Sequence, residues 1–262
     1  MEKYARVYNA TVVRRKSFKP PYRNHLTASK MPSFAHQDDF STATVTALRM
    51  FARKDDYVTP SDFALNAISH GNHYEAHASR LIRNHQFFRG YLFEEPHFDG
   101  IWSITGTWMV RSTGESFMFS ATPDMMIQNF KGTVFPVEIK CPYKSYIDGF
   151  NLSPEYIKSS HWIQLQAQML LMGASYGFLC IYMPARGTES EQAIIWKVFG
   201  SKESHKFILD LTYNVYAKLP QCKEEKDYKV QFRAKNGEKK SVKDFIDQEI
   251  KNNSRVVLRV NC

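Results

Sequence analysis

Apolar side chains recur along this chain with two different spacings, which together predict both helices and strands. Residues 38–53 and 59–84 place apolar side chains three or four positions apart, as on one face of a helix. Aromatic and β-branched residues, which favour strands, gather at 91–98, 101–111, 116–122, 124–129 and 133–140. A helix over 153–172, strands over 176–183 and 193–199, and a helix over 201–219 follow. This order favours an α/β fold (α+β-like), with a central mixed β-sheet flanked by helices.

The length of 262 residues suits a single domain, and 43% hydrophobic residues suffice for a sizeable core. We divide the chain into a basic N-terminal arm (1–22), a core (23–219) and a charged C-terminal extension (220–262). Weaker signals in the extension predict a short helix from Ser241 and strands at 231–233 and 256–260.

Several protein classes are disfavoured by what the sequence lacks. It has no apolar run of about eighteen residues, so we expect no membrane span. The motifs of serine hydrolases, P-loop NTPases and dinucleotide-binding folds are also missing. The four cysteines are not spaced as zinc ligands, which favours free thiols in a reducing, intracellular compartment.

The net charge of +9 is concentrated at the N-terminus. Residues 1–30 hold eight Lys and Arg against one Glu, with Tyr and Phe interleaved. A basic segment with aromatic residues suits a polyanion such as nucleic acid. A solvated arm without a ligand is an equally good interpretation of this pattern.

The segment 121–143 carries the most specific pattern. If Phe130-Lys131-Gly132 form a hairpin loop, Gly132 supplies the left-handed residue that this loop needs, and Asp124 then faces Glu138 across the hairpin. Two like charges in that position are destabilising, and a divalent cation between them removes the cost. Lys140 lies on the same strand face as Glu138.

This arrangement predicts a metal site that can cleave a phosphodiester bond. Asp124, Glu138 and the main-chain carbonyl of Ile139 would supply the oxygen ligands that Mg²⁺ or Mn²⁺ prefers. Lys140 would orient or deprotonate the attacking water, or stabilise charge on the phosphate. The alternative is a surface hairpin with an incidental ion pair.

Two predicted helices carry further polar candidates. Glu75 lies among apolar neighbours and is either a third metal ligand or an ordinary exposed glutamate. His161, Gln164 and Gln168 share one helix face, which either meets the phosphate and water or is a solvated edge. Histidines 70, 73 and 77 also share a helix side, where solvated histidines are a more common outcome than a zinc site.

Taken together, these motifs resemble the lambda exonuclease branch (YqaJ-type viral recombinases) of the PD-(D/E)xK nuclease superfamily. The segments that carry the resemblance are RNHLTAS at 23–29, GNHYE at 71–75, TPD at 122–124, VEIKCPY at 137–143, IKSSHWIQLQ at 157–166 and a strand ending in YMP at 182–184.

The resemblance implies a set of catalytic roles. Asp124 and Glu138 would bind two catalytic metal ions, with Glu75 as a further acidic ligand. Lys140 would be the catalytic lysine, and Gln164 would help to hold the nucleophilic water.

The resemblance also implies a substrate. Arg23 and Ser29 would bind the 5′-phosphate of duplex DNA, and Arg14, Arg15 and Lys16 of the basic arm would add DNA contacts. Such enzymes degrade one strand from its 5′ end and leave a 3′ single strand for an annealing protein, in recombination or viral DNA processing, and lambda exonuclease is a ring-shaped trimer. An endonuclease of the same fold and a non-catalytic nucleic-acid-binding module are the alternatives.

Overall fold

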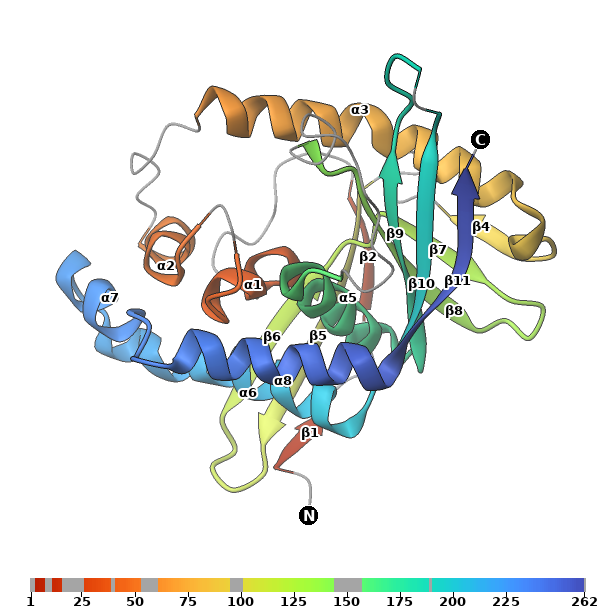
Figure 1. Ribbon diagram of the computed structural model, residues 1–262. Helices are drawn as coiled ribbons and strands as arrows, with labels where there is room; N and C mark the ends of the chain where they lie inside the picture. The colour runs from red at the N-terminus through yellow and green to blue at the C-terminus, as the bar shows by residue number, and fades with distance from the viewer. Residues whose placement is uncertain are drawn as a thin grey trace.

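The computed structural model describes residues 3–7, 11–15, 26–38, 41–52, 61–94, 101–143, 157–188 and 190–261. Its α-helices are α1 (Met31–Phe34), α2 (Ala43–Phe51), α3 (Asp62–Asn84), α5 (Ser159–Met172), α6 (Lys202–Lys218), α7 (Glu225–Gln231) and α8 (Glu238–Asn253) (Figure 1). Three short 3₁₀ segments are η1 (Ala28–Lys30), η2 (Gln86–Phe88) and η3 (Leu219–Gln221). Among the described helices, none combines the length and apolar character needed to cross a membrane.

The strands form two mixed sheets instead of a single central one. The first sheet contains β1 (Tyr4–Arg6), β2 (Thr11–Arg15), β5 (Ile101–Val110), β6 (Ser116–Ala121) and β3 (Leu26–Thr27). The second runs in the order β11 (Ser254–Asn261), β10 (Gln192–Phe199), β9 (Tyr176–Met183), β8 (Val134–Lys140), β7 (Met125–Gln128) and β4 (Leu92–Glu94). Each sheet has one parallel pair, β3 with β6 and β8 with β9. The predicted mixed α/β architecture is therefore confirmed, with its strands divided between two sheets.

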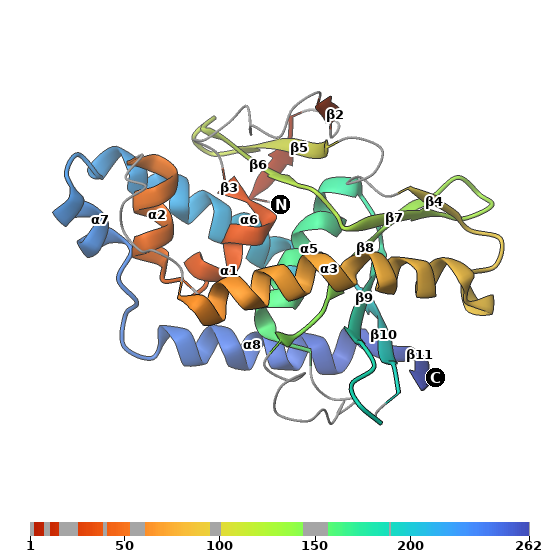
Figure 2. The same cartoon turned by 90° about the horizontal axis from the view of Figure 1, so that it is seen from above.

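Helix α5 lies between the two sheets (Figure 2). It contacts β5 and β6 of the first sheet and β8 and β9 of the second. Apolar residues surround α5 on most of its circumference, which is the pattern of a helix buried on all sides. The division into two sheets follows from this helix, since each sheet buries one face against it.

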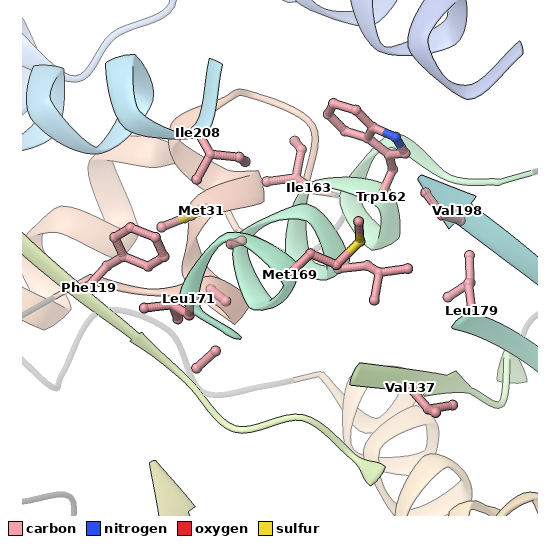
Figure 3. Packing of buried hydrophobic residues seen from close by; sticks show 14 of the residues in the cluster. Met31, Phe119, Val137, Trp162, Ile163, Met169, Leu171, Leu179, Val198 and Ile208 are labelled. Atoms are coloured by element: carbon pink, nitrogen blue, oxygen red, sulfur yellow. The ribbon is translucent and has the colours of Figure 1, made fainter. Parts of the chain in front are cut away.

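The hydrophobic core is built outward from α5 (Figure 3). Its Met169 and Leu171 are fully buried, as are Phe119 of β6 and Leu179 of β9. Next to Leu179 in the strand, the ring of Phe178 packs against Phe88, with centroids 5.3 Å apart, on the side covered by α3. The second sheet therefore has α5 on one face and α3 on the other.

The hairpin of β7 and β8 has the predicted register. Met125 pairs with Val137 and Gln128 with Val134, so Asp124 stands directly before β7 opposite Glu138. Gly132 has a φ of 78°, the left-handed conformation that the turn requires. The sequence pattern therefore located these two carboxylates correctly.

A buried polar contact fixes α5 against its neighbours. Gln166 is fully buried, and its Nε2 donates to the Phe199 carbonyl at 3.0 Å. Its Oε1 accepts from the Ser204 hydroxyl at 3.0 Å. Because both amide atoms are satisfied, Gln166 has a structural explanation that needs no ligand.

Two predicted helices begin later than expected because of their caps. Helix α2 begins at Ala43, since the Thr42 hydroxyl accepts from the Val45 amide at 3.3 Å. Helix α3 is capped by Ser61, whose hydroxyl accepts from the Ala64 amide at 3.3 Å.

The expected strand at 231–233 is wrong, because α7 ends there. Tyr228 and Phe232 are four residues apart and both buried, so a helical turn is needed to point both rings into the core. Helix α8 begins at Glu238, one turn earlier than Ser241, whose amide donates to the Gly237 carbonyl at 3.0 Å. The strand expected at 256–260 is confirmed as β11.

Parts of the arm and the extension belong to the folded core. Within the predicted arm, β1 and β2 both pair with β5, and Tyr4 is buried. Within the extension, Ile246 of α8 is fully buried and β11 forms the edge of the second sheet.

We predict that Gly177→Ala destabilises the fold by about 1–3 kcal/mol, since overfilling a packed core has that cost. A Cβ on Gly177 would lie 2.9 Å from Leu165 Cδ1 and 3.1 Å from the Pro136 carbonyl oxygen, where β9 meets α5. Gly71→Ala in α3 is the matched control, because its Cβ would meet nothing within 4 Å. Gly71→Ala should raise the free energy of unfolding by about 0.5–1 kcal/mol, because alanine has a higher helix propensity than glycine. Urea unfolding measures both, and equal free energies for the two variants would contradict this packing.

Candidate active site

Asp124 lies where the chain passes from the first sheet to the second. It follows the end of β6 by three positions and stands directly before β7. Its Oδ2 accepts a hydrogen bond of 2.7 Å from the Ile139 amide. This bond fixes the half-buried carboxylate against the end of β8.

Glu138 is the most buried charged group of the site, with an exposed fraction of 0%. Its Oε1 accepts from Lys140 Nζ, and its Oε2 accepts from Gln168 Nε2 at 2.5 Å. Burial, followed by the nearby Asp124 carboxylate, raises the pKa of Glu138 to about 7, although the hydrogen bonds from Lys140 and Gln168 act in the opposite direction. The repulsion expected from the facing carboxylates is therefore present in the fold.

Lys140 supplies the compensating positive charge. Burial alone would lower the pKa of Lys140, but the carboxylates of Glu138, Asp124 and Glu75 together raise it above its ordinary value. The side chain keeps 27% of its surface exposed. Lys140 is therefore a cation at neutral pH that contacts the Glu138 carboxylate and solvent.

Glu75 reaches the same site from α3, which packs against β8. The half-buried Glu75 carboxylate contributes to the raised pKa of Lys140 and, after burial, to that of the Cys141 thiol, which rises to about 12. The fold thus brings together the three acidic residues predicted from the sequence, although Glu75 is 49 residues from Asp124 and 63 from Glu138 in the chain.

One face of α5 closes the site. Gln168 contacts Glu138. The pKa of His161 is lowered well below its ordinary value, mainly by burial and then by the charges of Lys140 and Lys158. Gln164 lies between His161 and Gln168 on this face and is half-buried. Within the described chain the Gln164 side chain makes no hydrogen bond. A contact between Gln168 and Glu138 was not among the roles predicted for this face from the sequence.

The predicted DNA-binding residues lie partly on the same side of the molecule. Strand β3 runs parallel to β6, so the C-terminal ends of the two strands lie side by side. The chain continues from β3 into η1, which carries the exposed Ser29, and from β6 to Asp124. Arg14 and Arg15 pair with Trp102 and Ile101. Because Ile104 pairs with Ala121, that end of β2 is also the end from which Asp124 emerges.

Two of the predicted residues, Lys16 and Arg23, lie outside the described residues. The side chains of Arg14 and Arg15 are likewise outside what the structure describes. For these four residues the DNA-binding assignment stays a prediction.

The donor chemistry of the site fits a hard divalent cation. The carboxylates of Asp124, Glu138 and Glu75 interact electrostatically with one lysine, and oxygen ligands of this kind are those that Mg²⁺ and Mn²⁺ take. In the described part of the chain, no three acidic, His or Cys side chains are already arranged around a common ion position. That includes the histidines of α3, where His70 and His73 instead pack against the ring of Tyr74.

We predict that Glu138→Gln changes how the stability of the metal-free protein depends on pH. The folded-state pKa of about 7 lies above the ordinary glutamate value of about 4.3, so the folded protein holds this proton more tightly than the unfolded chain. The stabilisation that protonated Glu138 provides is complete below a pH of about 4.3 and is lost as the pH rises through 7. Glu138→Gln should therefore raise the melting temperature at pH 8 and leave it nearly unchanged at pH 4.

Thermal melts in a metal chelator measure this effect. Glu203→Gln on the exposed start of α6 is the matched control and should follow the wild-type curve. Parallel pH curves for the wild type and Glu138→Gln would show that Glu138 is not the strained carboxylate.

Comparison with known proteins finds similarity only at the level of structure. No family model and no curated protein sequence matches this chain. A crystal structure of an alkaline exonuclease (LHK-Exo) from Laribacter hongkongensis is similar at 18% identity, over 75% of this chain and 88% of that one, with a TM-score of 0.48. The crystal structure of SSO0001 is similar at 17% identity, over 80% and 82%, with a TM-score of 0.45.

Proposed function

We propose that this protein is a divalent-metal-dependent deoxyribonuclease that degrades one strand of duplex DNA in the 5′ to 3′ direction. The observation that carries the proposal is the fully buried Glu138 carboxylate, which faces Asp124 and is neutralised by Lys140. Fold stability alone gives no reason to place two repelling carboxylates together, and perturbed groups of this kind are typical of functional sites.

Asp124, Glu138 and Glu75 would hold the metal, with the Ile139 carbonyl as a further oxygen ligand. Two Mg²⁺ or Mn²⁺ ions are proposed, following the resemblance in the motifs. When bound, such ions lower the pKa of a water molecule and neutralise the scissile phosphate.

For Lys140 the raised pKa argues against one of the three roles left open by the sequence, deprotonation of the water. A lysine whose pKa is raised by three carboxylates keeps its proton at neutral pH and is a poor base. Lys140 would therefore stabilise negative charge on the phosphate and orient the water. Gln164, whose amide makes no hydrogen bond within the described chain and which lies on the same face of α5, would hold that water.

The 5′ polarity is proposed from the basic groups beside the site. The same end of the first sheet holds Asp124, Ser29 of η1 and the last two residues of β2, Arg14 and Arg15. With Arg23 and Lys16 they would bind the terminal phosphate and the duplex. On the resemblance in motifs, the proposal extends to recombination or viral DNA processing, an annealing partner for the 3′ single strand and a ring-shaped homotrimer.

We predict Mg²⁺-dependent loss of end-labelled linear duplex from its 5′ ends, with closed circular DNA left intact. Asp124→Asn should reduce the rate roughly 10³-fold, because metal-assisted catalysis contributes several kcal/mol and each 1.36 kcal/mol is one factor of ten. Asp247→Asn on the exposed part of α8 is the control and should keep wild-type activity. Nicking of the circle would overturn the exonuclease mode in favour of an endonuclease, and metal-independent or absent cleavage would overturn the proposed function.

We also predict that Arg14→Gln, Arg15→Gln and Lys16→Gln together weaken DNA binding and flatten its salt dependence. Each phosphate contact that is lost removes about 0.9 from the slope of log K against log salt. Point substitutions are preferable to deletion of the arm, since β1 and β2 pair with β5. The control changes Lys239, Lys240 and Lys243 of α8 to Gln, and an equal loss of slope in both proteins would show a non-specific charge effect.

A further inference from the structure

Gln168 is a polar residue in an apolar position. Its side chain is 1% exposed, and its neighbours in α5, Ala167 and Met169, are fully buried. Burying an amide is unfavourable unless its atoms are hydrogen-bonded. Its Nε2 donates to Glu138 Oε2 at 2.5 Å, while its Oε1 has no partner among the described residues.

Packing does not account for this glutamine in the way that it accounts for Gln166. Both amide atoms of Gln166 are satisfied by the protein, through Phe199 and Ser204. Gln168 donates its one hydrogen bond to the candidate metal ligand Glu138, and its Oε1 has no partner among the described residues. Its placement is therefore explained by Glu138.

The two donors on Glu138 differ in how easily they can leave. Gln168 is 1% exposed in a helix that lies between two sheets, so its amide is enclosed by the protein. Lys140 is at the end of a strand, with 27% of its side chain exposed, and can turn toward solvent or substrate. Oε1, which Lys140 contacts, is thus the exchangeable oxygen, and Oε2 is the fixed one.

We propose that Gln168 is a positioning residue that fixes Oε2 of Glu138 and so presents Oε1 to the divalent cation when Lys140 moves away. This inference rests on the proposed function and assigns a specific role at the same site. Gln168 touches neither the substrate nor the reacting atoms and acts only through Glu138. Gln164, one turn earlier on α5, keeps its separate proposed role at the water.

The direct test is Mn²⁺ binding to the full chain without DNA, followed by titration calorimetry. Gln168→Met keeps the length of the side chain but removes the amide, and Gln168→Asn keeps an amide that is too short to reach Glu138. Both should bind Mn²⁺ about 10–100-fold more weakly, the range observed when a hydrogen-bond partner of a metal ligand is removed. One variant is apolar and the other polar, so the test remains valid if one of them fails to fold.

Cleavage assays add a readout that a purely structural role would not change. Saturating Mn²⁺ should return the maximal rate of both variants to near the wild-type value, because only the occupancy of the metal site is affected. Lys140→Met should bind Mn²⁺ at least as tightly as wild type, since it removes the cation that competes for Oε1. Gln248→Met on the exposed face of α8 is the control and should leave Mn²⁺ affinity unchanged.

The outcomes separate the inference from the proposed function. Wild-type Mn²⁺ affinity in folded Gln168→Met and Gln168→Asn would overturn the inference while leaving a metal-dependent nuclease intact. Weaker Mn²⁺ binding by Lys140→Met than by wild type would overturn the assignment of Oε1 as the exchangeable oxygen. A wild-type protein that binds no Mn²⁺ and cleaves no DNA would overturn the proposed function itself.

Discussion

The charge of Glu138 has to be balanced inside the protein, and the surrounding structure is arranged to do so. The carboxylate is fully buried and faces Asp124, a combination that raises its pKa and would be unfavourable without a nearby cation. Lys140 supplies the balancing charge from a strand, and Gln168 adds a hydrogen bond from a helix. Because the two donors come from elements that also carry the core, the position of β8 relative to α5 determines the geometry of the site.

Helix α5 therefore both packs between the two sheets and contacts Glu138, and these two roles require different kinds of side chain. Packing between two sheets requires apolar residues around most of the helix, as Leu165, Met169 and Leu171 provide. Contact with Glu138 requires a polar residue, which Gln168 supplies, and both Gln168 and His161 on the same face leave a buried polar atom without a partner in the described chain. Polar atoms left unsatisfied in this way are uncommon in a stable core. In the described part of α5, Gln168 Oε1 and His161 Nδ1 belong to the face that includes Gln164, and Trp162 Nε1 is a third such atom on another face.

How far the sequence could predict this site depends on how local each contact is. The register of β7 and β8 is set by a short loop ending in Gly132, so the juxtaposition of Asp124 and Glu138 was predictable from a few residues. The spacing along α5 identified the correct helix face, but it could not say which residue of that face meets Glu138, since this depends on the depth at which α5 lies between the sheets. The division into two sheets and the α7 helix at 225–231 depend on long-range packing and were not predicted.

The metal-free arrangement also has a consequence for the order of events at the site. Lys140 contacts the same carboxylate that a divalent cation would need, so the lysine and the cation compete for Glu138 when both are present. A lysine displaced from Glu138 keeps its proton at neutral pH, because the ordinary lysine pKa of about 10.4 lies well above 7, and it has to find another anion nearby. The phosphate of a bound strand is such an anion. Metal binding and placement of Lys140 on the substrate would then be coupled, since each makes the other more favourable.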